Sequence, residues 1–204
     1  ASTALARPPP SASWPANSAL TANRWSGVQL YHYNKQKYRD IAIVTLLLGT
    51  GVRVSECVGL NISDVDFKNN GIRILRKGGN EMIVYFGDEV EAALKDYLEL
   101  TRNGITPISG HEDALFLSGQ KKRISVDAVE KMVKKYTSAI SVKTITPHKL
   151  RSTDGTALYR ETGDIYLVAD VLGHSDVNTT KRHYARLSDD RRRAASKAVT
   201  LREK

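Results

Sequence analysis

The sequence predicts a mainly α-helical domain that carries one small antiparallel β-sheet. Apolar residues recur at helical spacing in several segments, and three short alternating runs separated by turn residues lie close together between positions 65 and 86. The chain has 204 residues, of which 41% are hydrophobic, so it is long enough to bury a core. We expect a single folded domain over residues 27–204.

The first 26 residues differ in composition from the rest. They are rich in Ala, Ser and Pro, include Pro8-Pro9-Pro10 and contain no acidic residue, which is typical of a linker or a cloning remnant without regular structure. The remaining residues keep 29 basic and 22 acidic side chains. Because this excess of positive charge belongs to the folded part, a polyanion such as nucleic acid is the favoured partner.

The first elements alternate between helix and sheet. A buried helix is expected from Tyr38 to Leu48, with Gly49 and Gly51 breaking it, and a short helix then runs through Leu60. The three strands of the sheet are expected at residues 65–67, 72–75 and 82–86.

The second half of the chain is predicted to be helical. Asp88 and Ser125 are candidate caps of two helices, and Pro147 suits the first turn of a third that runs to about Glu161. Further helices are expected at residues 165–172, where Gly173 ends the helix, from about residue 178, and at 188–201.

Several classes of protein are disfavoured. Cys57 is the only cysteine, which excludes an intramolecular disulfide and suits a small core residue. The apolar run 41–48 is far too short to cross a bilayer, and the chain does not open with a signal peptide, so we expect a cytoplasmic protein without membrane contact. The histidines form no compact ligand motif such as His-Glu-x-x-His, so a metal site is not expected.

Basic residues at three places suggest an anion site. His148 and Arg151 share a face near the start of a helix, although a solvated basic helix start explains them equally well. Arg53 follows a glycine break beside the core, where Glu56 is its alternative partner. Lys77 lies at the tip of the predicted hairpin, where most lysines are simply solvated.

The order of these residues is more specific than any one of them. After Arg53, Lys77, His148 and Arg151 come Leu172-Gly173-His174 and, ten residues after His174, Tyr184. In this respect residues 27–204 resemble the catalytic domain of tyrosine recombinases, the integrase family of phages and mobile elements. The resemblance implies that family's fold and an enzyme that breaks and rejoins DNA by transesterification.

The resemblance also implies a role for each residue. Tyr184 is the nucleophile that forms a 3′-phosphotyrosine, and Arg53 and Arg151 clamp the phosphate. Lys77 is the general acid for the leaving 5′ oxygen, His148 assists proton transfer, and His174 aligns the phosphate. This chemistry requires no metal or nucleotide.

Two positions depart from the family pattern. The tyrosine more often follows the histidine by nine residues, where this chain has His183, but Tyr184 is the only tyrosine after Tyr166. Asp154 falls on the apolar face of its helix, where the family usually has an aromatic or apolar residue. It either pairs with a cation such as Arg151 or destabilises the fold by burying charge, and the second is slightly favoured.

The resemblance further implies partners. We expect double-stranded DNA and other protomers, with a tetramer on paired sites and the C-terminal helix at 188–204 docking on a neighbour. The DNA-gripping core-binding domain that precedes the family's catalytic part is expected to be absent, which leaves weak, salt-sensitive binding. Two alternatives stay open: a type IB topoisomerase-like enzyme and a DNA-binding module without catalysis.

Overall fold

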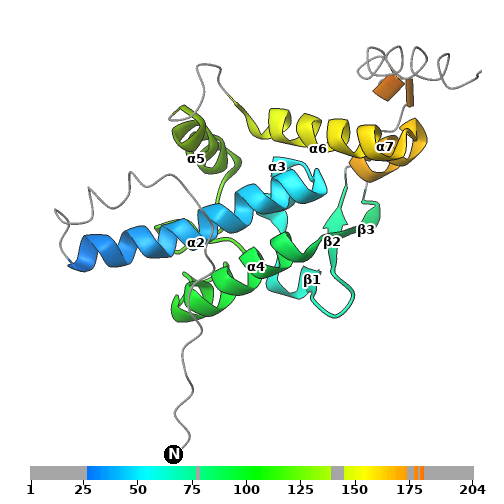
Figure 1. Ribbon diagram of the computed structural model, residues 1–204. Coiled ribbons are helices and arrows are strands. Elements are labelled where there is room, and N and C mark those ends of the chain that lie inside the picture. The colour runs from blue at the N-terminus through cyan, green and yellow to red at the C-terminus, as the bar shows by residue number, and fades with distance from the viewer. Residues whose placement is uncertain (1–26, 77–78, 139–144, 174–176, 179, 182–204) are drawn as a thin grey trace, which may run out of the picture.

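The computed structural model describes residues 27–76, 79–138, 145–173, 177, 178, 180 and 181, with side chains from residue 36 on. The predicted linker at 1–26 and the C-terminal helix at 188–204 lie outside the described residues. Within them, the fold is mainly helical with one small antiparallel sheet, as the sequence predicts (Figure 1). None of the described helices is long and apolar enough to cross a membrane.

The long helix α2 (Gly27–Thr50) lies at the centre of the fold and packs against both α4 (Asp88–Leu100) and α6 (Pro147–Thr162) (Figure 1). The other helices are α3 (Val54–Gly59), α5 (Val126–Ser138) and α7 (Ile165–Leu172), with short 3-10 turns η2 (Ile62–Asp64) and η3 (Arg102–Gly104). Helix α7 contacts α6 and lies beside the end of the sheet.

The sheet has the order β1-β2-β3, with β1 (Val65–Asp66), β2 (Gly71–Leu75) and β3 (Glu81–Tyr85) all antiparallel. Ile72 pairs with Val84, and both side chains point into the core. Because side chains alternate along a strand, the residues on the other face stay exposed. The hairpin therefore projects from the core while remaining fixed to it by one apolar face.

The first helix is longer than predicted at both ends, and Gly49 does not end it. Helix α2 begins at Gly27 and continues to Thr50, and Gly51, with a φ of 60°, makes the turn. A Cβ at Gly49 would lie 2.7 Å from the side chain of Val90 on α4. Gly49 thus permits close packing of two helices, whereas Gly51 adopts the left-handed backbone that favours glycine.

Two of the three predicted helix starts are confirmed. The Ser125 hydroxyl accepts a hydrogen bond from the Ala128 amide at 3.2 Å, and Thr146 caps α6 with Pro147 at its first position. The prediction for Asp88 was wrong: Gly87 occupies the cap position and Asp88 lies inside the first turn of α4. There its carboxylate interacts favourably with the positive end of the helix dipole.

Cys57 has the role expected of it. The thiol is fully buried in the main core, and burial raises its pKa to about 12. It is a small apolar residue and not a nucleophile.

Asp154 is a half-buried carboxylate on α6 that packs against the backbone of Gly51. Burial raises its pKa from 3.8 to about 6, although the nearby Arg151 acts in the opposite direction. Among the described residues, the Arg151 guanidinium donates to backbone carbonyls and forms no ion pair with Asp154. Of the two explanations left open by the sequence, the structure favours a destabilising buried charge over an ion pair.

Loss of the Thr146 cap should weaken the start of α6. The Thr146 hydroxyl accepts from the Lys149 amide at 3.3 Å, so Thr146→Ala should cost about 1 kcal/mol of unfolding free energy, measured by urea denaturation. Thr153→Ala is the matched control, because that exposed threonine in the same helix bonds only to the Lys149 carbonyl. An equal loss in both variants would contradict the capping role.

Asp154→Asn should remove a pH dependence of stability. Since the folded pKa lies above 3.8, protonation stabilises the fold fully below about pH 4, and this stabilisation is lost as the pH rises through about 6. At pH 8 the variant should therefore melt roughly 2–4 °C higher than the parent, which corresponds to about 1 kcal/mol after discounting for solvent screening.

The control for this experiment is Asp127→Asn, which removes an exposed carboxylate from α5. Its melting temperature should show the same pH dependence as that of the parent. The difference in Tm between Asp154→Asn and the parent should grow from pH 5 to pH 8. A difference that stays constant would refute the buried-charge explanation.

Candidate active site

Arg53 is held at the start of α3 by Glu56. The Arg53 amide donates to Glu56 Oε2 at 2.7 Å, and its guanidinium Nη1 donates to Oε1 at 2.9 Å. The Glu56 side chain is only 5% exposed, so this ion pair is fixed by its surroundings. The alternative partner proposed from the sequence is therefore present, but it does not occupy the whole guanidinium: Arg53 Nη2 also donates to the carbonyl of Gly173 at 2.9 Å.

Arg151 enters the same region from α6. Its side chain is buried, and its guanidinium donates through Nη1 to the carbonyl of Gly51 and through Nη2 to the carbonyl of Leu172. Burial and then the neighbouring Arg53 lower the pKa of Arg151 to about 10. The group thus remains a cation at neutral pH, with both contacts made to backbone oxygens.

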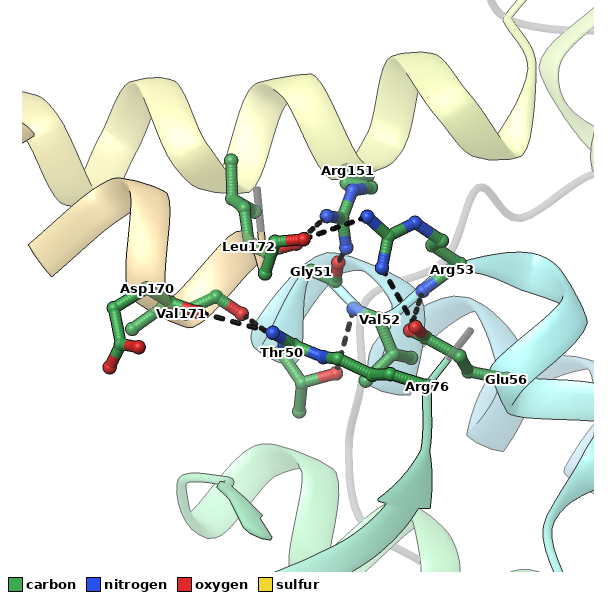
Figure 2. A network of polar contacts seen from close by, with 11 residues as sticks. Thr50, Gly51, Val52, Arg53, Glu56, Arg76, Arg151, Asp170, Val171 and Leu172 are labelled. Carbon is green, nitrogen blue, oxygen red and sulfur yellow. Dashed lines mark hydrogen bonds and ion pairs between the residues drawn. The ribbon is translucent and has the colours of Figure 1, made fainter. Parts of the chain in front are cut away.

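The two guanidinium groups meet at the C-terminal end of α7, where they bind consecutive carbonyls (Figure 2). This end of a helix carries a partial negative charge, which partly offsets the repulsion between the cations. A guanidinium has five N–H donors, and the described contacts use two from Arg53 Nη1 and Nη2 and two from Arg151. The remaining donors suit a bound oxyanion such as phosphate.

A hollow of about 360 Å³ adjoins this pair of arginines. Arg53, His148 and Arg151 line it together with Val52, Val54, Ser55 and Pro147. His148 is exposed in the first turn of α6, whose positive end favours an anion. The structure thus brings together three of the six residues that the sequence singles out: both arginines and one histidine.

The other three predicted residues, Lys77, His174 and Tyr184, lie outside the described residues. Two of their chain neighbours are described, and these neighbours are in contact. The Arg76 guanidinium fills the space that a Cβ on Gly173 would occupy, and Gly173 has a φ of 60°. The end of β2 and the end of α7 therefore lie against each other.

Arg76 is the residue of this region to which sequence reasoning assigned no role. Its Nη2 donates to the carbonyl of Val171 at 3.0 Å and its Nη1 to the carbonyl of Asp170 at 3.4 Å (Figure 2). Its position next to Lys77 was the only available signal. A sequence pattern cannot predict that Arg76 binds backbone carbonyls about 95 residues away in the chain.

The described residues contain no group of three His, Cys, Asp or Glu side chains arranged to hold a metal ion. The site is instead built from guanidinium groups, an imidazole and backbone carbonyls. The guanidinium and imidazole N–H groups can donate hydrogen bonds to a phosphate, and the carbonyls hold the guanidinium groups in place.

Comparison with known proteins gives one consistent result. A tyrosine recombinase XerS from Streptococcus agalactiae serotype III (strain NEM316) is 38% identical over 178 residues, which are 86% of this chain and 49% of that protein. The chain thus spans about half the length of the curated relatives it matches. The crystal structure of XerA recombinase is 35% identical with a TM-score of 0.66, covering 76% of this chain and 56% of the other.

A third relative is the integrase of the Tn1549 transposon, solved in complex with transposon right end DNA. It is 28% identical with a TM-score of 0.61, covering 89% of this chain and 63% of the other. Residues 26–191 match the phage integrase family. The chain therefore belongs to the phage integrase family, and its described residues adopt the catalytic-domain fold of the tyrosine recombinases.

Proposed function

We propose that residues 27–204 are the catalytic domain of a site-specific DNA recombinase that breaks and rejoins strands through a 3′-phosphotyrosine. The observation that carries this proposal is the convergence of Arg53 and Arg151, 98 positions apart, on neighbouring carbonyls beside a hollow that also reaches His148. Family membership supports the same chemistry.

The arginine pair would bind the scissile phosphate. Attack on a phosphodiester builds negative charge on the non-bridging oxygens, and two fixed guanidinium groups stabilise that charge in the transition state. Since both groups are already oriented by Glu56 and by backbone carbonyls, little reorganisation accompanies the reaction.

Tyr184 would attack the phosphorus atom. Its hydroxyl oxygen forms the new P–O bond while the bond to the 5′ oxygen breaks, and Lys77 supplies the proton that this oxygen takes up. A phenol of pKa near 10 needs assistance at neutral pH, and His148 would accept or relay its proton while His174 aligns the phosphate. The bond energy is retained in the phosphotyrosine, so a free 5′ hydroxyl can reverse the step and rejoin a strand.

The partners would be double-stranded DNA and further protomers, assembled as a tetramer on paired sites. The transposon integrase among the relatives supports integration or excision of a mobile element as the purpose, and a place in the bacterial cytosol or nucleoid follows from that role. Because phosphate contacts would dominate binding by this domain, its affinity should fall steeply with salt.

Tyr184→Phe should abolish covalent DNA adducts while leaving DNA binding unchanged, because only the attacking hydroxyl is lost. The probe is a pool of nicked duplexes randomised around the nick, in which cleavage frees a short strand and traps the adduct. Adducts are detected as protein–DNA bands that survive denaturation, and sequencing them gives the preferred duplex.

Tyr166→Phe is the matched control, since Tyr166 is an exposed tyrosine on α7, and it should form adducts at the parent's rate. Adducts that persist in Tyr184→Phe would defeat the assignment of the nucleophile. If the parent chain binds the pool but forms no adduct, the domain is a DNA-binding module without catalytic activity. Adducts that never join strands of two separate duplexes would indicate a topoisomerase-like enzyme.

Removal of residues 188–204 should disrupt assembly without disrupting cleavage. The predicted last helix has a narrow apolar stripe at Ala194, Ala195, Ala198 and Val199, which suits docking on a neighbouring protomer. Native gels with the selected duplex should then show single protein–DNA complexes in place of paired ones. Unchanged paired complexes would speak against docking in trans.

A further inference from the structure

The C-terminal end of α7 receives a third arginine in addition to the proposed phosphate pair. Arg76 donates to the carbonyls of Asp170 and Val171, directly before the carbonyls that Arg151 and Arg53 bind. Three cations from three separate elements therefore bind four consecutive carbonyls (Figure 2).

The described partners of Arg76 are backbone carbonyls. Arg76 does not line the hollow that Arg53, His148 and Arg151 share; together with Arg53 and Gly173 it lines a larger one of about 980 Å³ between α3, the hairpin and α7. Both Nη atoms of Arg76 point to backbone carbonyls, and its buried Nε has no partner among the described residues. These contacts fix the end of β2 to the C-terminal end of α7.

Gly173 makes this arrangement possible. A Cβ on Gly173 would overlap the Arg76 guanidinium, and its left-handed backbone ends α7 so that the 173 carbonyl turns toward Arg53. Gly173 thus leaves room for the Arg76 side chain, and its carbonyl binds Arg53, one of the two arginines proposed to bind the phosphate.

We propose that Arg76 is a positioning residue for the recombinase reaction: it fixes the end of α7 against β2, and so keeps the Leu172 and Gly173 carbonyls where they orient Arg151 and Arg53. Only the effect of Arg76 on the reaction rate rests on the proposed function. The fastening of α7 to β2 can be tested without DNA.

The DNA-free test is hydrogen exchange of the whole chain. Arg76→Met keeps the length of the side chain and removes both hydrogen bonds, so the amides at the C-terminal end of α7 should exchange about tenfold faster. Arg73→Met is the matched control, because Arg73 lies on β2, which Arg76 directly follows, and forms an exposed ion pair with Asp64. Unchanged exchange at α7 in Arg76→Met would overturn the proposal.

The catalytic test compares two versions of the selected nicked duplex. In one, a methylphosphonate replaces the scissile phosphate and removes the charge that the arginine pair neutralises. Arg76→Met should form adducts about tenfold more slowly than the parent on the phosphate but within about threefold of it on the methylphosphonate. Arg151→Ala should show the same rescue, and Arg76→Lys should lie between Arg76→Met and the parent because it cannot bind two carbonyls as a fork.

A third duplex separates this role from an effect on the neighbouring Lys77. A sulphur atom at the 5′ bridging position leaves without a general acid, so it should rescue Lys77→Ala but not Arg76→Met. Rescue of Arg76→Met by sulphur, or an equal loss on all three duplexes, would overturn the proposal. Absence of any adduct in the parent would instead refute the proposed function, and the exchange experiment would still decide whether Arg76 holds α7.

Discussion

The interaction on which the site depends is the binding of arginine side chains to the carbonyl end of α7. Arg53 precedes α3, Arg76 follows β2 and Arg151 lies in α6, and the carbonyl end of α7 binds all three side chains. Three neighbouring cations repel one another, and the negative end of a helix with Glu56 beside it offsets only part of that repulsion. The cluster therefore favours an additional anion, and we propose that this anion is the DNA phosphate.

Glycines allow these elements to approach so closely. Gly51 and Gly173 both have a φ of 60°, and their carbonyls receive Arg151 and Arg53 respectively. A side chain at either position would be strained and would also overlap Asp154 or Arg76. The site thus depends on backbone positions as much as on the charged side chains that contact them.

The sequence predicted the helices and the sheet well because their apolar periodicity and turn residues are local signals. It failed at Gly49, where a tertiary contact with Val90 explains the glycine, and at Gly87, which takes the cap position expected for Asp88. The arginine pair was found through the order of residues along the chain. Arg76 was missed because its partners are backbone carbonyls, which every residue has and no pattern marks.

The most direct test of the account is a kinetic double-mutant cycle of Arg53→Lys and Arg151→Lys, measured as the rate of adduct formation on the selected nicked duplex. Both guanidinium groups are bound at the C-terminal end of α7. If they hold the same phosphate, the rate of the double variant should fall by a factor far smaller than the product of the two single factors. Losses that multiply fully would show that the two arginines act independently, and would contradict the shared site.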